Sequence, residues 1–189
     1  MPAAFSVYLD TGGTDNSPGT STDIDALGPP ALRFKQADNP TIDSNAVMPV
    51  PSAGTEYSRW KQLYLLCDTA PDTQVDNIRF FTDGTGFGTG ITVNVADQFP
   101  VHNAGATTGY DVSDTNQVMT NHTDITTTTD AFTFTSGSPL SGPSISEAGS
   151  IINATSETTN YLVLQMEVIS TASPGNLTDE TMTFRYDEI

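Results

Sequence analysis

Short segments in which apolar and polar residues alternate recur along the chain, and this period of two is typical of β-strands. No window of twelve residues has apolar positions at the helical spacing without clusters of glycine, proline or threonine. The clearest strand pattern lies in residues 161–169, where Leu162, Leu164, Met166 and Val168 fall on one face. We predict about eight strands, which cover residues 5–9, 31–35, 60–67, 78–81, 91–95, 131–135, 161–169 and 182–186.

Residues 60–67 (WKQLYLLC) are apolar on both faces of the predicted strand, which is expected of a central strand that is buried on both sides. The segments between the strands are rich in glycine, proline, asparagine and aspartate, which favour turns. This pattern predicts an all-β fold, a single antiparallel β-sandwich of the jelly-roll or Ig-like kind. A length of 189 residues suits one domain, so we predict that residues 1–189 form it.

The long connections are concentrated in the N-terminal half of the chain. Residues 10–30 and 36–58 have little periodicity, and we interpret 10–58 as a loop-rich segment that could become ordered only on assembly with a neighbour. Residues 96–130 are also weakly patterned, with candidate edge strands at 110–112 and 117–119.

The net charge of −17 results from 23 acidic residues against 6 basic ones. Such a balance excludes nucleic-acid binding through a basic face and argues against an anionic membrane surface as partner. A lysine-poor, aspartate-rich surface stays hydrated at high salt, so a marine or salt-loving source fits this composition. Because salt screens the repulsion between the carboxylates, we expect thermal stability to rise towards near-molar salt.

Carboxylates in the loops are candidate calcium ligands, because Ca²⁺ prefers oxygen ligands. The two candidate groups are Asp23 with Asp25, and Asp68 with Asp72 and Asp76. No complete EF-hand loop is present, so the sequence leaves a bound metal open, and it predicts no cofactor.

The densest glycine segment, residues 83–90 (DGTGFGTG), does not match the dinucleotide-binding spacing and precedes a predicted strand. We therefore predict a hairpin loop between strands 78–83 and 91–95. His102 and His122 lie far apart in loop-like segments and are interpreted as surface residues. The single cysteine, Cys67, excludes a disulfide framework and is expected to be a buried, inert thiol. We predict no catalytic residue and expect the chain not to be an enzyme.

All six basic residues lie in or beside predicted strands. We expect them to pair with acidic residues on the sheet surface, or alternatively to mark a face that docks on an acidic partner. They are Arg33, Lys35, Arg59, Lys61, Arg79 and Arg185.

The first residues contain no basic region followed by an apolar run, so we expect synthesis in a host cytoplasm without a signal peptide. No segment approaches the roughly 18 apolar residues of a membrane span.

Two segments and the C-terminus resemble a known class of protein. Residues 57–65 (YSRWKQLYL) and 76–84 (DNIRFFTDG), together with 184–188 (FRYDE), are similar to small β-sandwich structural proteins of tailed viruses. The resemblance implies a virion component, either a capsid decoration (cement) protein or a neck or tail accessory protein. Its partners would be the major capsid protein or other virion proteins, in a homo-oligomer or symmetric array.

The leading hypothesis is therefore a non-enzymatic protein that docks on the assembled capsid and stabilises it. One alternative is a neck, tail or fibre component of the same particle. Another is a carbohydrate- or calcium-dependent binding module, for which exposed tyrosine or tryptophan in a groove would be evidence. The only tryptophan, Trp60, lies where we expect the core.

Overall fold

The computed structural model describes residues 2–11, 19–28, 32–41, 44–97, 118–122, 125–140 and 152–189. These residues form nine strands and three short 3₁₀-helices. No helix among them is long and apolar enough to cross a membrane. The elements are β1 (Ala4–Thr11), β2 (Thr20–Asp23), η1 (Asp25–Leu27), β3 (Thr55–Tyr57), β4 (Lys61–Thr69), β5 (Val75–Thr82), β6 (Ile91–Ala96), η2 (Met119–Asn121), β7 (Thr128–Asp130), η3 (Ala131–Thr133), β8 (Leu162–Ile169) and β9 (Met182–Glu188).

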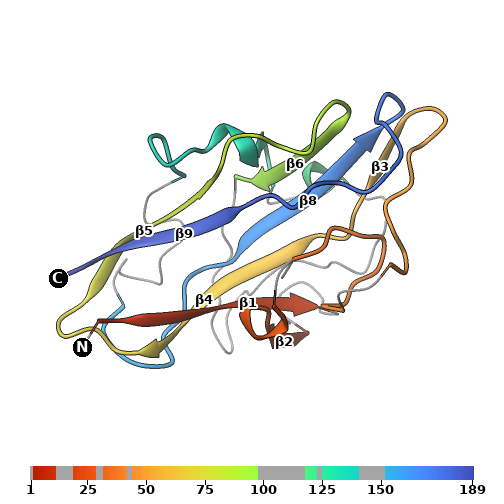
Figure 1. The fold of residues 1–189 in the computed structure, drawn as a ribbon. Coiled ribbons are helices and arrows are strands. Elements are labelled where there is room, and N and C mark those ends of the chain that lie inside the picture. The colour runs from red at the N-terminus through yellow and green to blue at the C-terminus, as the bar shows by residue number, and fades with distance from the viewer. Residues whose placement is uncertain are drawn as a thin grey trace.

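Seven strands form one antiparallel sheet, which we call the large sheet (Figure 1). Six of them follow the order β2-β1-β4-β8-β6-β7, and the seventh, β3, pairs with β8 beside this path. One edge of β8 pairs with β6, and its other edge pairs with β4 at residues 162–164 and with β3 at residues 167–169. Strand β4 lies between β1 and β8, and its residues 61–65 are all buried. The prediction of a central strand at 60–67 is therefore confirmed.

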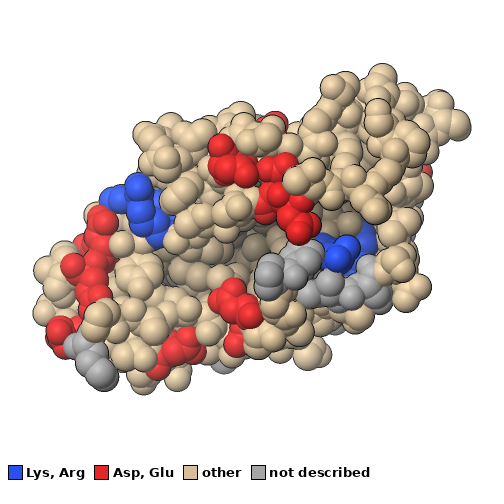
Figure 2. Space-filling model, viewed as in Figure 1, with Lys and Arg blue, Asp and Glu red and all other residues tan. Residues whose placement is uncertain are grey.

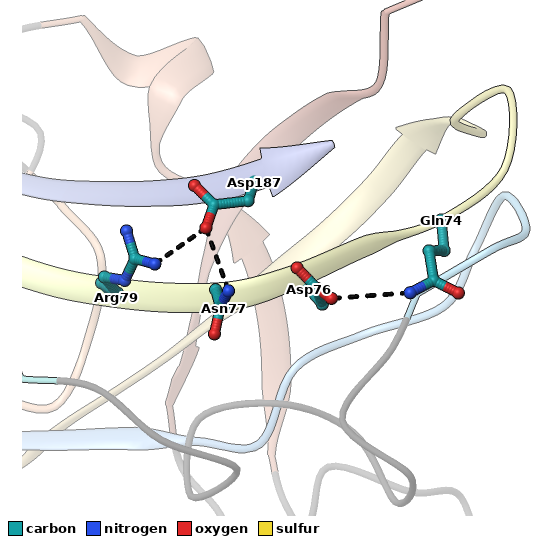
Figure 3. A network of polar contacts seen from close by, with 5 residues as sticks. All are labelled: Gln74, Asp76, Asn77, Arg79 and Asp187. Atoms are coloured by element: carbon teal, nitrogen blue, oxygen red, sulfur yellow. Dashed lines mark hydrogen bonds and ion pairs between the residues drawn. The ribbon is translucent and has the colours of Figure 1, made fainter. Parts of the chain in front are cut away.

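The small sheet consists of β5 and β9, which are antiparallel. Their register shifts between Asp76 and Arg79, where Asn77 adopts a φ of 50°. The carboxylate of Asp187 accepts hydrogen bonds from Asn77 Nδ2 at 3.0 Å and from Arg79 Nη2 at 2.8 Å (Figure 3). The Arg79–Asp187 contact is also an ion pair, and Gln74 Nε2 donates to Asp76 at 3.5 Å beside it. These cross-strand contacts hold β9 in register on β5.

The main core lies between the two sheets. Alternate residues of β4 and β8 point towards the small sheet, and they meet buried residues of β5 there. The fold is thus an all-β antiparallel sandwich, as predicted, while the choice between a jelly-roll and an Ig-like arrangement stays a prediction. The residues at its centre include Leu63, Leu65, Ile78, Phe80, Leu162 and Leu164.

A second apolar cluster covers the opposite face of the large sheet. Trp60 is only 1% exposed, as expected from its place in the pattern. The ring of Tyr64 contacts that of Tyr161 edge-on, with 5.6 Å between centroids. Met119 and Ile125, from the segment that follows β6 in the chain, complete the cover. We call this surface the closed face of the large sheet.

Two of the strand predictions are wrong for the residues that the structure describes. Residues 32–35 are irregular, because the backbone there bonds to neighbouring loops: Arg59 N–H donates to the Lys35 carbonyl. Residues 131–133 form η3, because Asp130 caps it by accepting a hydrogen bond from Phe132 N–H. The missed strands β2, β3 and β7 contain three or four residues each and are largely polar.

The candidate edge strand at 117–119 is also wrong where it is described. Met119 begins η2, and its N–H donates to Gln165 Oε1 at 3.1 Å. The candidate at 110–112, like His102, lies outside the described residues.

The glycine segment 83–90 is not a hairpin loop. It connects β5 in the small sheet to β6 in the large sheet, so the two strands do not pair. Four of its glycines have positive φ values: Gly84, Gly86, Gly88 and Gly90. A Cβ on Gly90 would lie 2.6 Å from Ala172 N, so this crossing also requires close backbone packing.

Candidate functional site: an apolar groove beside strand β9

A groove of about 760 Å³ opens between β9 and β1 on the core side of the large sheet. Its floor is formed by Val7 of β1, Leu63 of β4 and Met166 of β8, and one wall by Met182 and Phe184 of β9. Figure 2 shows the hollow near the middle of the molecule, in the same view as Figure 1. Deleting one large apolar side chain leaves roughly 150 Å³, so the groove has room for about five side chains.

Apolar side chains continue from the floor to the mouth of the groove. Residues 32–35 line it together with Asn45, Val47 and Met48, and residues 175–181 continue the lining at the N-terminal end of β9. Two of these lining residues are large apolar side chains that face solvent: Val47 is 61% exposed and Leu177 is 41% exposed. Exposed apolar surface that gathers around a concavity marks an interaction site more often than isolated exposed residues do.

The rim of the groove is acidic. Its lining includes the carboxylates of Asp25, Asp179 and Glu180, and Figure 2 shows acidic side chains on both sides of the hollow. Two cationic residues also line it. Arg33 is exposed, whereas Lys35 is buried and donates from Nζ to the Thr41 carbonyl at 2.9 Å. Among the described residues, the rim therefore has three carboxylates against one exposed guanidinium.

One rim carboxyl interacts with a neighbouring acid. Burial raises the pKa of Glu180, and the hydrogen bond and negative charge of Asp83 raise it further. The pKa of Asp83 is lowered, chiefly by the hydrogen bond that its side chain accepts from Thr85 N–H. A cation brought to this part of the rim would relieve the repulsion between the two carboxyl groups.

The outer edge of β9 faces the groove. Among the described strands β9 pairs only with β5. The carbonyl of Thr181 and both backbone groups of Ile189 bond to the β5 side. Because alternate residues of a strand direct their N–H and C=O groups to opposite sides, those of Met182, Phe184 and Tyr186 point away from β5.

Strands β1 and β9 contact each other beyond the groove lining, at the C-terminal end of β9. The Phe5 and Tyr186 rings pack there with 4.8 Å between centroids, and Tyr186 donates its hydroxyl to the Ala3 carbonyl. Strands β1 and β9 belong to different sheets, so this contact joins the sheets at one end while the groove separates them at the other.

A buried lysine lies on the core side of β4, close to other cations. Lys61 is fully buried, and its Nζ makes no hydrogen bond with a described residue. Burial lowers the pKa of Lys61 to about 8; the charge of Asp38 opposes this effect, and those of Lys35 and Arg59 add to it. The expectation of pairing on the sheet surface is therefore wrong for Lys61, whereas Arg79 is confirmed by its ion pair with Asp187.

The candidate calcium ligands mostly serve the backbone and nearby side chains. Asp25 accepts a hydrogen bond from Val7 N–H at 2.9 Å, Asp23 accepts from Ala26 N–H, and Asp68 accepts from the Ser6 hydroxyl. The described residues contain no group of three or more His, Cys, Asp or Glu side chains that could hold a metal ion. Asp68, Asp72 and Asp76 are therefore not gathered into one site.

The remaining candidates for chemistry are engaged in the fold. Cys67 is 1% exposed, and burial together with nearby negative charge raises the pKa of its thiol, which confirms a buried residue that disfavours the reactive thiolate. His122 is half-buried, with its ring 6.0 Å from that of Trp60.

Sequence reasoning missed the groove. Its lining comes from β1, β4, β5, β8 and β9, from η1 and from the loops between these elements, so no local motif marks it. The available signal was the alternation of Met182, Phe184 and Tyr186, which indicates a strand with one apolar face but not which of its edges is paired.

Comparisons of the chain with protein-family models, with curated proteins and with solved structures find no match.

Proposed function

We propose that the chain is a non-enzymatic structural protein of a virus particle, which docks as a decoration (cement) protein on the assembled capsid and stabilises it. The major capsid protein or another virion protein is then its partner, and copies of the chain form a homo-oligomer or symmetric array on the shell. The observation that supports docking most directly is the apolar groove along the outer edge of β9.

Two kinds of surface favour assembly over catalysis. The groove offers apolar side chains, and the strand edge beside it offers backbone N–H and C=O groups to another chain. The resemblance of residues 57–65, 76–84 and 184–188 to virion sandwich proteins points to a particle as the place of assembly. A neck, tail or fibre component would use the same surfaces but occupy fewer sites.

The carbohydrate-binding alternative receives no support from the aromatic residues. Trp60 lies in the closed face at 1% exposure, and the aromatic residues that line the groove are phenylalanines. We therefore propose docking on protein rather than on a glycan.

Quantitative mass spectrometry of particles purified from the source culture tests this proposal. We expect peptides of this chain at a copy number comparable to that of the major shell protein. Shells depleted of the protein should lose resistance to heat and regain it when the protein is added back. A few copies per particle would move the assignment to the neck, tail or fibre, and absence from particles would overturn the virion proposal.

A further inference from the structure

We propose that the groove accepts an extended, lysine- or arginine-bearing apolar segment of another protein, which adds as a third strand to the small sheet along the outer edge of β9. This inference deepens the proposed function by naming how a partner is held. Its test uses isolated peptides, so it does not depend on whether that partner belongs to a capsid.

The backbone of β9 is the first argument. The N–H and C=O groups of Met182, Phe184 and Tyr186 point away from β5, and β9 has no other strand partner among the described residues. An added strand would lie about 4.8 Å from β9 and span roughly 17 Å over five residues. Main-chain hydrogen bonds along such an edge provide affinity for any extended segment.

The apolar floor is the second argument, because it selects the side chains of the added strand. Alternate residues of a strand next to β9 would point down onto Val7, Leu63 and Met166. Methionine side chains adapt to differently shaped partners, and Met48, Met166 and Met182 all line the groove. Val47 and Leu177 at the mouth would lose solvent exposure on binding.

Charge is the third argument, and it identifies the occupant as another protein. Residues of the added strand that face outward would lie near Asp25, Asp179 and Glu180, which favour lysine or arginine. This chain has only six basic residues at a net charge of −17, so a second copy would bring mainly repulsion to the rim. A basic, apolar segment of a different protein complements it.

The probe is the blocked nine-residue peptide acetyl-KVTVKVTVK-amide, labelled for fluorescence anisotropy. Two control peptides match it in length: one has glutamate for each lysine, and the other has N-methylated backbone at alternate residues. We expect only the unmodified lysine peptide to bind. Hydrogen exchange should show new protection at the amides of Met182 and Phe184, the β9 residues that line the groove, when it is bound.

Two double variants test the position of the charge. Asp179→Asn with Glu180→Gln removes two rim charges, and we expect it to weaken binding about fivefold at low salt. Asp68→Asn with Asp72→Asn changes the net charge equally away from the groove lining, and it should change the affinity by less than about twofold.

Several results would overturn the inference. One is the absence of lysine-peptide binding at millimolar concentration. A second is that the glutamate peptide or the N-methylated peptide binds as tightly as the lysine peptide. A third is that the two double variants lose the same amount of affinity for the lysine peptide. A dimer of this chain in sedimentation that the lysine peptide dissociates would identify a second copy as the occupant and would also contradict it. Peptide binding by a chain that is absent from particles would leave this inference standing and remove only the virion proposal.

Discussion

Trp60, Tyr64 and Tyr161 cover one face of the large sheet together with Met119 and Ile125. On the other face, beyond the edge of β9, the sheet is the floor of an open groove. The closed face is covered by residues from the segment that follows β6, whereas on the core side β9 is the last described strand of the small sheet and the groove lies between it and Val7 of β1. Among the described residues, one face of the large sheet is therefore fully covered, whereas the other has an open groove beside β9.

Polar contacts differ between the two faces as well. On the closed face, Asp10 is 1% exposed and accepts hydrogen bonds from the hydroxyls of Tyr161 and Ser21. Gln165, also buried, accepts from Met119 N–H and donates to the Ser58 carbonyl. On the groove side, the rim carboxylates of Asp25 and Asp179 are exposed and that of Glu180 is half-buried beside Asp83. Buried polar groups that have hydrogen-bond partners are typical of a protein interior, whereas exposed charges of one sign around an apolar surface are typical of an interface.

The largest expected effect comes from opening the closed face. Trp60→Ala should lower the free energy of unfolding by about 3–5 kcal/mol, because it removes a large buried side chain and leaves a cavity. Met182→Ala is the matched change on the groove wall, where the side chain is already partly exposed, and it should cost at most about 1 kcal/mol. Denaturant unfolding of both variants measures this contrast. Similar losses would show that the groove is as tightly packed in solution as the closed face.

The next variant is expected to raise the free energy of unfolding, and the size of this increase depends on pH. The pKa of Lys61 is about 8 in the folded protein and 10.5 in the unfolded chain, so between these values the unfolded chain binds more protons. Burial of the ammonium therefore destabilises the fold below pH 8, by about 3 kcal/mol, and this cost disappears as the pH rises to 10.5. We expect Lys61→Met to be more stable than the natural protein at pH 7.

Comparing unfolding of the two proteins between pH 7 and 11 tests this expectation, because titrating groups common to both cancel in the difference. The advantage of Lys61→Met should shrink as the pH rises above 8. A difference that is constant across this range would mean that Lys61 is not desolvated in the native state.

A smaller decrease in the free energy of unfolding is expected when a hydrogen-bond donor to the buried carboxylate of Asp10 is removed. Tyr161→Phe leaves Asp10 with one fewer hydroxyl partner and should cost about 1–3 kcal/mol. Tyr186→Phe is the control at the junction of the sheets, where the lost bond to the Ala3 carbonyl is only partly buried. If thermal unfolding shows that the two variants lose equal stability, the buried hydrogen bond on the closed face contributes no more than the partly buried one.

Much of the sandwich could be predicted from the sequence because its core strands alternate. Strands β1, β4, β5, β6, β8 and β9 coincide with predicted segments, since each has an apolar face in the main core. Strands β2, β3 and β7 are short and polar, and backbone pairing to a neighbour defines them rather than side-chain burial. Phe132 and Phe134 show the limit of the pattern: they alternate like a strand, but the cap at Asp130 turns the chain into η3.

The groove could not be predicted for a different reason. The alternation in 182–186 predicts a strand, yet its pairing with β5, its only partner among the described strands, joins segments more than one hundred residues apart. The prediction of a hairpin at 83–90 is wrong because local pattern does not show which strands pair. Strands that are adjacent in the chain need not belong to one sheet. Local pattern determines which residues are buried, whereas the position of an open edge depends on long-range pairing.

The smallest expected effect tests whether the acidic rim is part of the contrast between the faces. Salt screens exposed charges over about 10 Å at 0.1 M and about 3 Å at 1 M, so a protein of net charge −17 should melt at a higher temperature in near-molar salt. Asp179→Asn removes a charge from the rim, where three carboxylates line one groove, and should raise low-salt stability by a few tenths of a kcal/mol. Asp72→Asn, away from the groove lining, should change it less, and the difference should vanish at 1 M salt. Melting curves that are flat with salt would show that the rim carboxylates are already neutralised, and the groove would then lack the charge that distinguishes it from the closed face.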